Sequence, residues 1–185
     1  MNFQEHIYFI AIIPPQDICD EINVFKNDFK NRFHSQAALK IVPHITLKPP
    51  FKLTISKHEE LCKWFKELDF SMKPFLQVLD GFGSFETSRR PVVFVKPVMN
   101  NSLSQLQQEL LHHFTNRFSW IEVRESDRKF KPHITIGYRD LDHRAYIQAW
   151  QEYKEKHYNS SFEVNEICLL QHKDGRWWTI ERKEI

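Results

Sequence analysis

The sequence has little glycine, little cysteine and no long hydrophobic run, and each shortage excludes a class of protein. Its 185 residues include 4 glycines and 9 prolines, which excludes a collagen-like chain and a flexible linker protein. The 3 cysteines, Cys19, Cys62 and Cys168, are odd in number, widely spaced and without a CxxC pair, so neither a disulfide framework nor a zinc ribbon is indicated. We expect buried thiols in a reducing compartment.

An excess of charge of one sign is also missing. Lys and Arg number 26 against 24 Asp and Glu, too balanced for a protein that holds long nucleic acid by phosphate neutralisation alone, so any basic site is local. Aromatic content of 14% and a mean hydropathy of −0.54 exclude an acidic disordered chain and a membrane bundle. The apolar run 7–13 is too short to span a membrane and follows Glu5 and His6, so we expect a cytoplasmic protein without a membrane partner.

Hydrophobic spacing predicts a similar order of elements in both halves of the chain. Pro14 and Pro15 open a helix whose apolar positions Ile18, Ile22, Phe25 and Phe29 recur at steps of three and four residues. The other elements expected in the first half are strands at 6–13, 41–48 and 74–80, the last ending at Gly81 and Gly83, and a helix at 57–67. In the second half they are strands at 90–98 and 130–138, helices at 102–118 and 141–156, and a hairpin of 162–170 with 176–182.

This repetition predicts a pseudo-twofold-symmetric α+β fold of two lobes. Residues 1–185 are expected to form a single domain, with lobe one at about 1–85 and lobe two at about 86–185. Exchange of strands between the lobes is left open.

The repeat is sharpest in two tetrapeptides. Pro-His-Ile-Thr occurs at 43–46 and again at 132–135, each preceded by a lysine at the matching place, Lys40 and Lys129. The probability that a given tetrapeptide occurs by chance in a chain of this length is roughly one in a thousand. The duplication therefore indicates that both halves of the chain need this element. A single His-x-Thr strand is best explained by packing, but packing gives no reason to repeat it.

Strand alternation decides what these tetrapeptides present. His44 and Thr46 point to one face while Ile45 and Leu47 point to the other, and His133 and Thr135 repeat the arrangement. Imidazole, with a pKa of about 6.5, serves as base in one copy and acid in the other at neutral pH. Two such pairs across one cleft suit phosphoryl transfer, with the threonine hydroxyls donating to phosphate oxygens and no metal or cofactor required.

The chain resembles the 2H phosphoesterases, in the branch of the bacterial RNA 2′,3′-cyclic phosphodiesterases also called 2′-5′ RNA ligases. The likeness covers nearly the whole chain and rests on the two H-x-T elements, the opening strand and helix, the GFGSFETSRRPVVFVKP segment and the closing hairpin. The resemblance implies two antiparallel sheets around a central groove with helices outside. It also implies opening of a 2′,3′-cyclic phosphate to a 2′-phosphate, with His133 activating water and His44 serving the leaving group.

Five further residues are candidates for substrate binding. Lys48 follows Thr46 on the same face and would add charge at the phosphate, or is a solvated lysine where Pro49 and Pro50 end the strand. Phe51, Tyr138 and Trp177 are candidate planes for base stacking, or core aromatics. RNA-acting relatives often carry an arginine soon after the second motif. Here the sequence reads Gly137-Tyr138-Arg139, so Arg139 is a candidate, and whether it reaches the phosphate stays open. Arg89 and Arg90 would guide a phosphodiester tail, or form a solvated turn.

The expected partner is an RNA 3′ end or a small cyclic nucleotide, bound by a monomer, and not a DNA duplex. No HExxH motif, Cys/His cluster or Gly-rich phosphate loop occurs in the sequence, so no metal or nucleotide cofactor is expected. A different class of function, a nucleotide or RNA-end binding module without turnover, stays open. So does a 2H enzyme that acts on 2′-5′ linkages or on another small phosphodiester.

Overall fold

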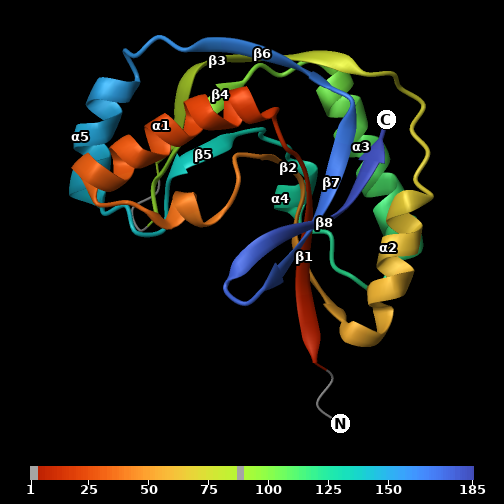
Figure 1. Cartoon of the computed structure of the whole chain (residues 1–185). Coiled ribbons are helices and arrows are strands. Elements are labelled where there is room, and N and C mark those ends of the chain that lie inside the picture. Colours follow the sequence, from red (N-terminus) through yellow and green to blue (C-terminus); the bar gives the residue numbers. More distant parts are fainter. Residues whose placement is uncertain (1–3, 87–89) are drawn as a thin grey trace.

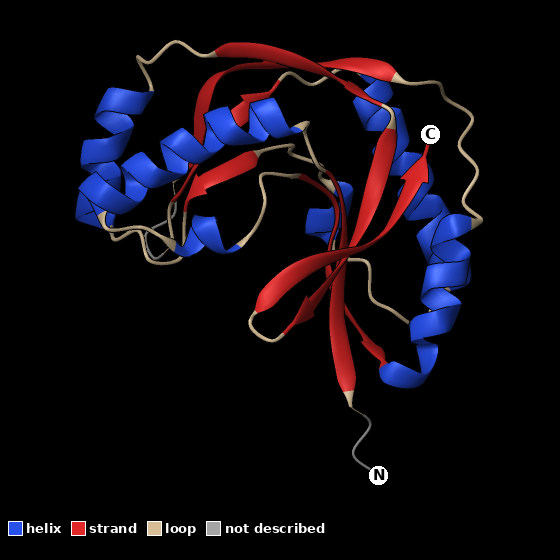
Figure 2. Cartoon of the chain, in the orientation of Figure 1, coloured by secondary structure: helices blue, strands red, loops and turns tan. Residues whose placement is uncertain are grey.

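The computed structural model describes residues 4–86 and 90–185, apart from the side chain of Ser126, and they form two antiparallel four-stranded sheets with helices outside (Figures 1 and 2). The α+β class and the paired sheets are thus confirmed. The first sheet has the order β2 (Ile45–Thr54), β1 (Glu5–Ile12), β7 (Glu166–Lys173) and β8 (Arg176–Glu184). The second has the order β5 (Ile134–Gly137), β4 (Val92–Pro97), β3 (Phe75–Phe85) and β6 (Asn159–Val164).

The helices form where the apolar spacing predicts them. Two begin with a side-chain cap, because Asn100 accepts a hydrogen bond from the Leu103 N–H and Asp142 accepts one from the Ala145 N–H. The main helices are α1 (Gln16–Phe33), α2 (His58–Lys66), α3 (Asn101–Arg117) and α5 (His143–Tyr153). Shorter turns are η1 (Ala37–Lys40), η2 (Ile55–Lys57) and α4 (Glu125–Arg128).

The sheets are not made from contiguous halves of the chain. Helix α1 follows β1 of the first sheet but packs against β5 of the second sheet and against helix α5. Helix α3 follows β4 of the second sheet but packs against β2 of the first (Figure 1). Strand β3 lies in the second sheet, and the β7–β8 hairpin returns to the first. The predicted boundary near residue 85 therefore does not separate the sheets, and one hydrophobic core with members from both sheets joins them.

The chain bends within two of the predicted strands, and this changes their bounds. Residues 162–170, predicted as one strand, are split at Asn165, where the chain passes from β6 in one sheet to β7 in the other. Strand β3 continues through Gly81, which adopts a φ of 67° where the register with β4 shifts. The glycine allows a bulge there and does not end the strand.

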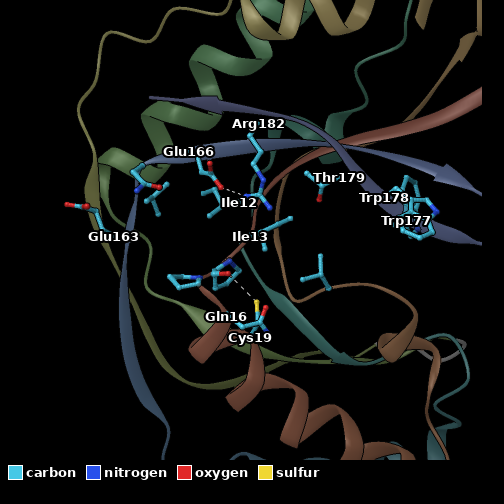
Figure 3. Close-up of a pocket in the computed structure, with 15 residues that line it drawn as sticks. Ile12, Ile13, Gln16, Cys19, Glu163, Glu166, Trp177, Trp178, Thr179 and Arg182 are labelled. Carbon is cyan, nitrogen blue, oxygen red and sulfur yellow. Dashed lines mark hydrogen bonds and ion pairs between the residues drawn. The ribbon is translucent and has the colours of Figure 1, made fainter.

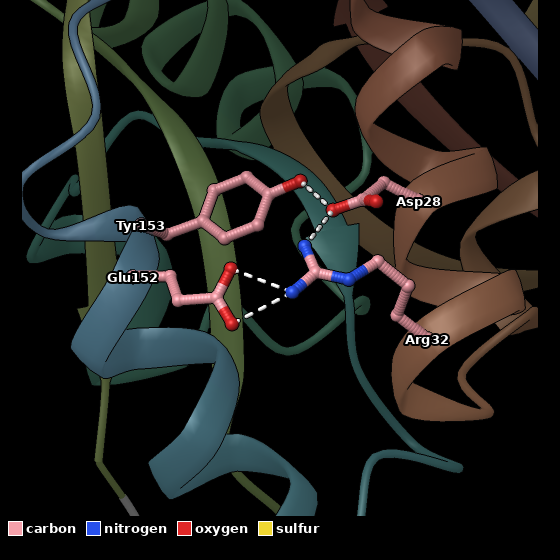
Figure 4. Close-up of polar contacts among 4 residues, drawn as sticks. All are labelled: Asp28, Arg32, Glu152 and Tyr153. Carbon is pink, nitrogen blue, oxygen red and sulfur yellow. Dashed lines mark hydrogen bonds and ion pairs between the residues drawn. The ribbon is translucent and has the colours of Figure 1, made fainter.

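Polar contacts fasten α1 to α5 across the outside of the second sheet (Figure 4). The Arg32 guanidinium donates to both carboxylate oxygens of Glu152 at 2.7 Å, and the Tyr153 hydroxyl donates to Asp28 at 2.8 Å. Tyr153 is completely buried, and burial together with the Asp28 carboxylate raises the pKa of its phenol. This clamp holds α1, whose other face supports the groove described below.

Candidate active site

The two repeated tetrapeptides meet in one cavity between the sheets. His44 and His133 lie just before β2 and β5, while Thr46 and Thr135 are the second residues of these strands. As the alternation predicts, the intervening residues face the core: Ile45, Leu47, Ile134 and Ile136 are at most 1% exposed. The four polar residues line a cavity of about 220 Å³, here called the histidine cavity, together with Tyr138, Arg139 and Trp177.

Each histidine is held in the same way by its own backbone. The Nδ1 atom of His44 lies 2.8 Å from the Val42 carbonyl oxygen, and that of His133 lies 2.7 Å from the Lys131 carbonyl oxygen. A carbonyl oxygen only accepts, so Nδ1 must donate its proton in both residues. The Nε2 atom of each neutral ring is then an acceptor, available as a base, and each protonated ring carries a donor there.

The surroundings favour the neutral form of both rings. Burial lowers the pKa of His44 to about 4, opposed by its hydrogen bond to Val42, while the Lys26 ammonium and His133 lower it further. Burial also lowers the pKa of His133, opposed by its hydrogen bond to Lys131. An anion placed between the rings would favour their protonated forms, so a phosphate ligand and a proton on imidazole would stabilise each other.

Aromatic side chains set the orientation of both imidazoles. The ring of Phe9 lies 5.0 Å from that of His44 and meets Trp177 edge to face at 4.6 Å. On the other side, the rings of Phe85 and Phe94 lie 5.1 and 5.5 Å from that of His133. Each imidazole is thus in contact with aromatic side chains as well as held by its hydrogen bond.

Arg139 reaches the histidine cavity through an unusual backbone turn. Its φ of 57° lies in the left-handed region, which costs energy for a residue with a side chain. The next residue, Asp140, anchors this turn, because its carboxylate accepts hydrogen bonds from the Ser35 hydroxyl and from the N–H groups of Gln36 and Ala37. The Arg139 guanidinium lies over the Tyr138 ring at 5.2 Å, so these two candidate binding residues lie side by side at the cavity.

Two other predicted binding residues lie away from the cavity, and both predictions are wrong. Pro49 and Pro50 do not end the strand: β2 runs on to Thr54, with shifts of register against β1 around them. After the shift Lys48 pairs with Ile10 and turns to the helix-covered face, where it is 2% exposed. Phe51 is 4% exposed and packs against Tyr8 and Phe114, so no base can stack on it.

Lys48 instead forms a buried ion pair. Its ammonium lies 2.8 Å from the Asp127 carboxylate on α4, and both side chains are at most 3% exposed. The Gln107 side chain of α3 donates to the Asp127 carbonyl oxygen at 2.9 Å. The pair joins the strand that bears Thr46 to the segment that leads into His133.

Lys26 is a residue that the sequence analysis missed. It is 1% exposed, burial lowers its pKa to about 8, and its ammonium donates to the Ile41 carbonyl oxygen at 2.8 Å. This hydrogen bond ties helix α1 to the loop that leads to His44. The signal for it was present, since Lys26 lies on the same helical stripe as the apolar Ile22 and Phe29.

Other expectations concern residues outside the cavity. Arg89 lies outside the described residues. Cys19 and Cys168 are buried free thiols as expected, whereas Cys62 is only partly buried. In the described ranges 4–86 and 90–185, no group of three or more His, Cys, Asp and Glu residues is placed to hold a metal ion. Over the same ranges, the helices are too short or too polar to cross a membrane.

The two sheets and the cavity formed by their paired His-x-Thr strands define the 2H phosphoesterase class. The family profile of the 2′-5′ RNA ligase superfamily matches residues 14–176, and the chain belongs to this family. It is 30% identical over 173 residues to a protein named "Putative phosphoesterase" from Geobacillus sp. (strain WCH70), covering 94% of this chain and 92% of the relative. A protein of the same name from Geobacillus kaustophilus (strain HTA426) is 29% identical, with the same coverage.

Solved structures show the same fold. The structure of E. coli LigT complexed with 3′-AMP superposes with a TM-score of 0.71 at 21% identity, covering 98% of this chain and 99% of that one. E. coli LigT complexed with NADP+ superposes with a TM-score of 0.64 at 20% identity and the same coverage. Both chains match over nearly their full length.

The buried ion pair gives a prediction about stability. Asp127→Ala leaves the Lys48 ammonium buried without its counter-ion, so we expect the free energy of unfolding to fall by about 3–5 kcal/mol. Lys48→Met combined with Asp127→Leu removes both charges and is expected to recover most of this loss. Urea denaturation measures both, with Glu67→Ala, which breaks only the exposed pair with Lys63, as the control. A loss below about 1 kcal/mol for Asp127→Ala would contradict a desolvated pair.

Proposed function

We propose that the protein is a metal-independent phosphodiesterase that opens 2′,3′-cyclic phosphates at RNA ends or on nucleotides and leaves a 2′-phosphate. The observation that carries the proposal is the pair of imidazoles in one cavity, each with Nδ1–H held by a carbonyl oxygen and Nε2 left for chemistry. Membership of the 2′-5′ RNA ligase superfamily supports it. The ligands of E. coli LigT, 3′-AMP and NADP+ among them, support a nucleotide phosphate as the group recognised.

Two proton transfers at Nε2 atoms complete the reaction. His133 takes a proton from water as the water oxygen bonds to phosphorus, and protonated His44 gives its proton to O3′ as the P–O3′ bond breaks. The product then carries the phosphate on O2′, and the total charge of the two imidazoles is unchanged. Because burial keeps His44 neutral in the free protein, the bound phosphate anion must raise its pKa before it can act as an acid.

The remaining residues of the cavity stabilise charge on the phosphate. The hydroxyls of Thr46 and Thr135 donate to the non-bridging oxygens, where negative charge grows in the transition state. Arg139 supplies the positive charge that had been expected of Lys48, and Tyr138 and Trp177 offer planes for the base. The same two proton transfers also permit a 5′-hydroxyl to take the place of water: its oxygen bonds to phosphorus, the P–O3′ bond breaks, and a 2′-5′ linkage forms.

Both histidines are therefore expected to be necessary for turnover. His44→Ala and His133→Ala should each lower kcat by about 10²–10⁴-fold, because each removes one proton transfer. The assay is hydrolysis of uridine 2′,3′-cyclic phosphate and of a short RNA with a cyclic 3′ end, in EDTA, with the product phosphate identified by phosphorus NMR. His112→Ala, on the exposed face of α3, is the matched control and should retain activity.

Circular dichroism spectra establish that the three variants are folded. Full activity in either active-site variant would contradict the two-histidine mechanism. Loss of wild-type activity in EDTA would contradict metal independence. Binding of nucleotides by the wild type without turnover of any cyclic phosphate would instead favour a binding module.

The lowered pKa values also predict the pH dependence. The active form has one neutral and one protonated imidazole, so it is populated between the two macroscopic pKa values of the pair. Burial moves both values below the usual 6.5, His44 to about 4, so kcat/KM should follow a bell with its maximum on the acidic side of pH 6.5. The maximum of kcat should lie at higher pH, because bound phosphate stabilises the protonated ring. A kcat/KM maximum above pH 7 would contradict this assignment.

A further inference from the structure

A second cavity opens directly beside the histidine cavity. Its volume is about 560 Å³, within the range of about 300–1,000 Å³ typical of small-ligand sites. It shares Thr46, Pro50 and His133 with the histidine cavity, so the two cavities are adjacent. We call it the lysine cavity, and its other lining residues are Leu47, Pro49, Phe85, Asp127, Lys129, Phe130 and Lys131.

The charge of the lysine cavity suits a phosphodiester. Lys129 and Lys131 are both exposed at its edge. Lys129 pairs with Glu125 at 2.6 Å, but both side chains are more than 70% exposed, so the pair is weak and a phosphate can compete for the ammonium. The acidic lining residue, Asp127, is neutralised by its buried contact with Lys48. A negative ligand therefore meets two cations and no opposing free acid among the residues that line the cavity.

Aromatic surface lies between these lysines and the reaction centre. Phe85 and Phe130 are half-buried, so each keeps part of its ring accessible. The Phe85 ring stands at 84° to that of His133, with 5.1 Å between centroids, which places it beside the imidazole that would activate water. A cationic edge with aromatic planes is the combination that binds single-stranded nucleic acid.

The opposite end of the groove has a different character. There a cavity of about 590 Å³, here called the Arg182 cavity, lies beyond Trp177 and is lined by Glu163, Glu166 and Arg182 among others (Figure 3). Arg182 forms an ion pair with Glu166, so these three charged side chains together carry a net negative charge. The Arg182 cavity is therefore less suited to a phosphodiester chain than the lysine cavity is.

We propose that the lysine cavity binds the penultimate nucleotide of the RNA, the one joined to the 5′ oxygen of the terminal nucleoside. Lys129 and Lys131 then lie at the phosphodiester between the two nucleotides, and Phe85 lies against the penultimate base. The terminal nucleoside then lies toward Tyr138 and Trp177. This inference rests on the proposed function and extends it, because it makes the oligonucleotide end the preferred substrate over a cyclic mononucleotide.

The test compares one substrate with another that is one nucleotide longer. Wild-type kcat/KM is measured for uridine 2′,3′-cyclic phosphate and for the uridine dinucleotide that ends in a 2′,3′-cyclic phosphate. We expect about a tenfold preference for the dinucleotide, at the lower end of what one stacked base contributes. The preference should weaken as salt is raised, because the contacts of the two lysines with the phosphodiester contribute to it alongside stacking.

A double variant and a matched control locate the effect. In Lys129→Ala/Lys131→Ala the dinucleotide-to-mononucleotide ratio of kcat/KM should fall several-fold, because the phosphodiester loses both cations while Phe85 can still contact the base. The control, Lys52→Ala/Lys63→Ala, removes the same charge from exposed positions outside the groove and should keep the wild-type ratio. The four lysines are exposed or only weakly paired, so thermal melts should show both variants folded.

The outcomes separate this inference from the proposed function. A wild-type ratio near one, or a ratio that survives in Lys129→Ala/Lys131→Ala, overturns the subsite while leaving the phosphodiesterase proposal intact. If neither substrate turns over, the phosphodiesterase proposal fails and the subsite is tested by calorimetric binding of uridine 3′-phosphate and of the dinucleotide 3′-phosphate. Tighter binding of the dinucleotide that depends on the two lysines supports the subsite, and equal binding overturns it.

Discussion

The hydrogen bond between a histidine Nδ1–H and the carbonyl oxygen two residues earlier is the constraint on which the rest of the site depends. It occurs twice, at His44 and at His133, and in each case it fixes both the tautomer and the orientation of the ring. In both Pro-His-Ile-Thr copies the bond forms where the segment that contains the proline leads into a strand. The remainder of the fold then has to bring two such strands, one from each sheet, to the same cavity.

Buried polar groups below the cavity maintain that arrangement. Lys26 supports the loop before His44, and the Lys48–Asp127 pair ties β2 to the segment before His133. At the surface, the exposed Asp140 carboxylate holds the turn that bears Arg139. Charges buried in this way cost desolvation energy, and well-packed apolar residues often stabilise a core more. Their placement around the site indicates that they position it.

Local regularities of the sequence were sufficient for much of this account. Alternation in β2 and β5 correctly placed Ile45 and Ile134 in the core and the His-x-Thr side chains on the other face. The stripe of apolar residues predicted helix α1 and its start after Pro15, and the helix continues four residues beyond Phe29, the last position of the predicted stripe. The duplication of Pro-His-Ile-Thr indicated a shared cleft, and the two copies line one cavity.

The predictions discussed below failed because they depend on contacts with residues far away in the sequence. The alternation of a regular strand predicted that Lys48 would share a face with Thr46. The register shifts against β1 turn it to the other face, and these shifts cannot be predicted from the sequence of β2 alone. The split of 162–170 into β6 and β7 depends on which strands already occupy each sheet. Phe51 could not be told from a surface aromatic without knowing that Tyr8 and Phe114 cover it. Asp140 acts through backbone groups of a segment far away in sequence.

The most direct measurement is the tautomeric state of the two histidines. Proton–nitrogen correlation spectra of protein labelled with ¹⁵N-histidine, assigned with His44→Ala and His133→Ala, show which nitrogen of each neutral ring carries the proton. At pH 7.5 the account predicts a protonated Nδ1 and an unprotonated Nε2 in both residues, because each Nδ1 faces a carbonyl oxygen. A proton on Nε2 of either neutral ring would contradict it, since that ring could not accept a proton from water or present a matched partner across the cavity.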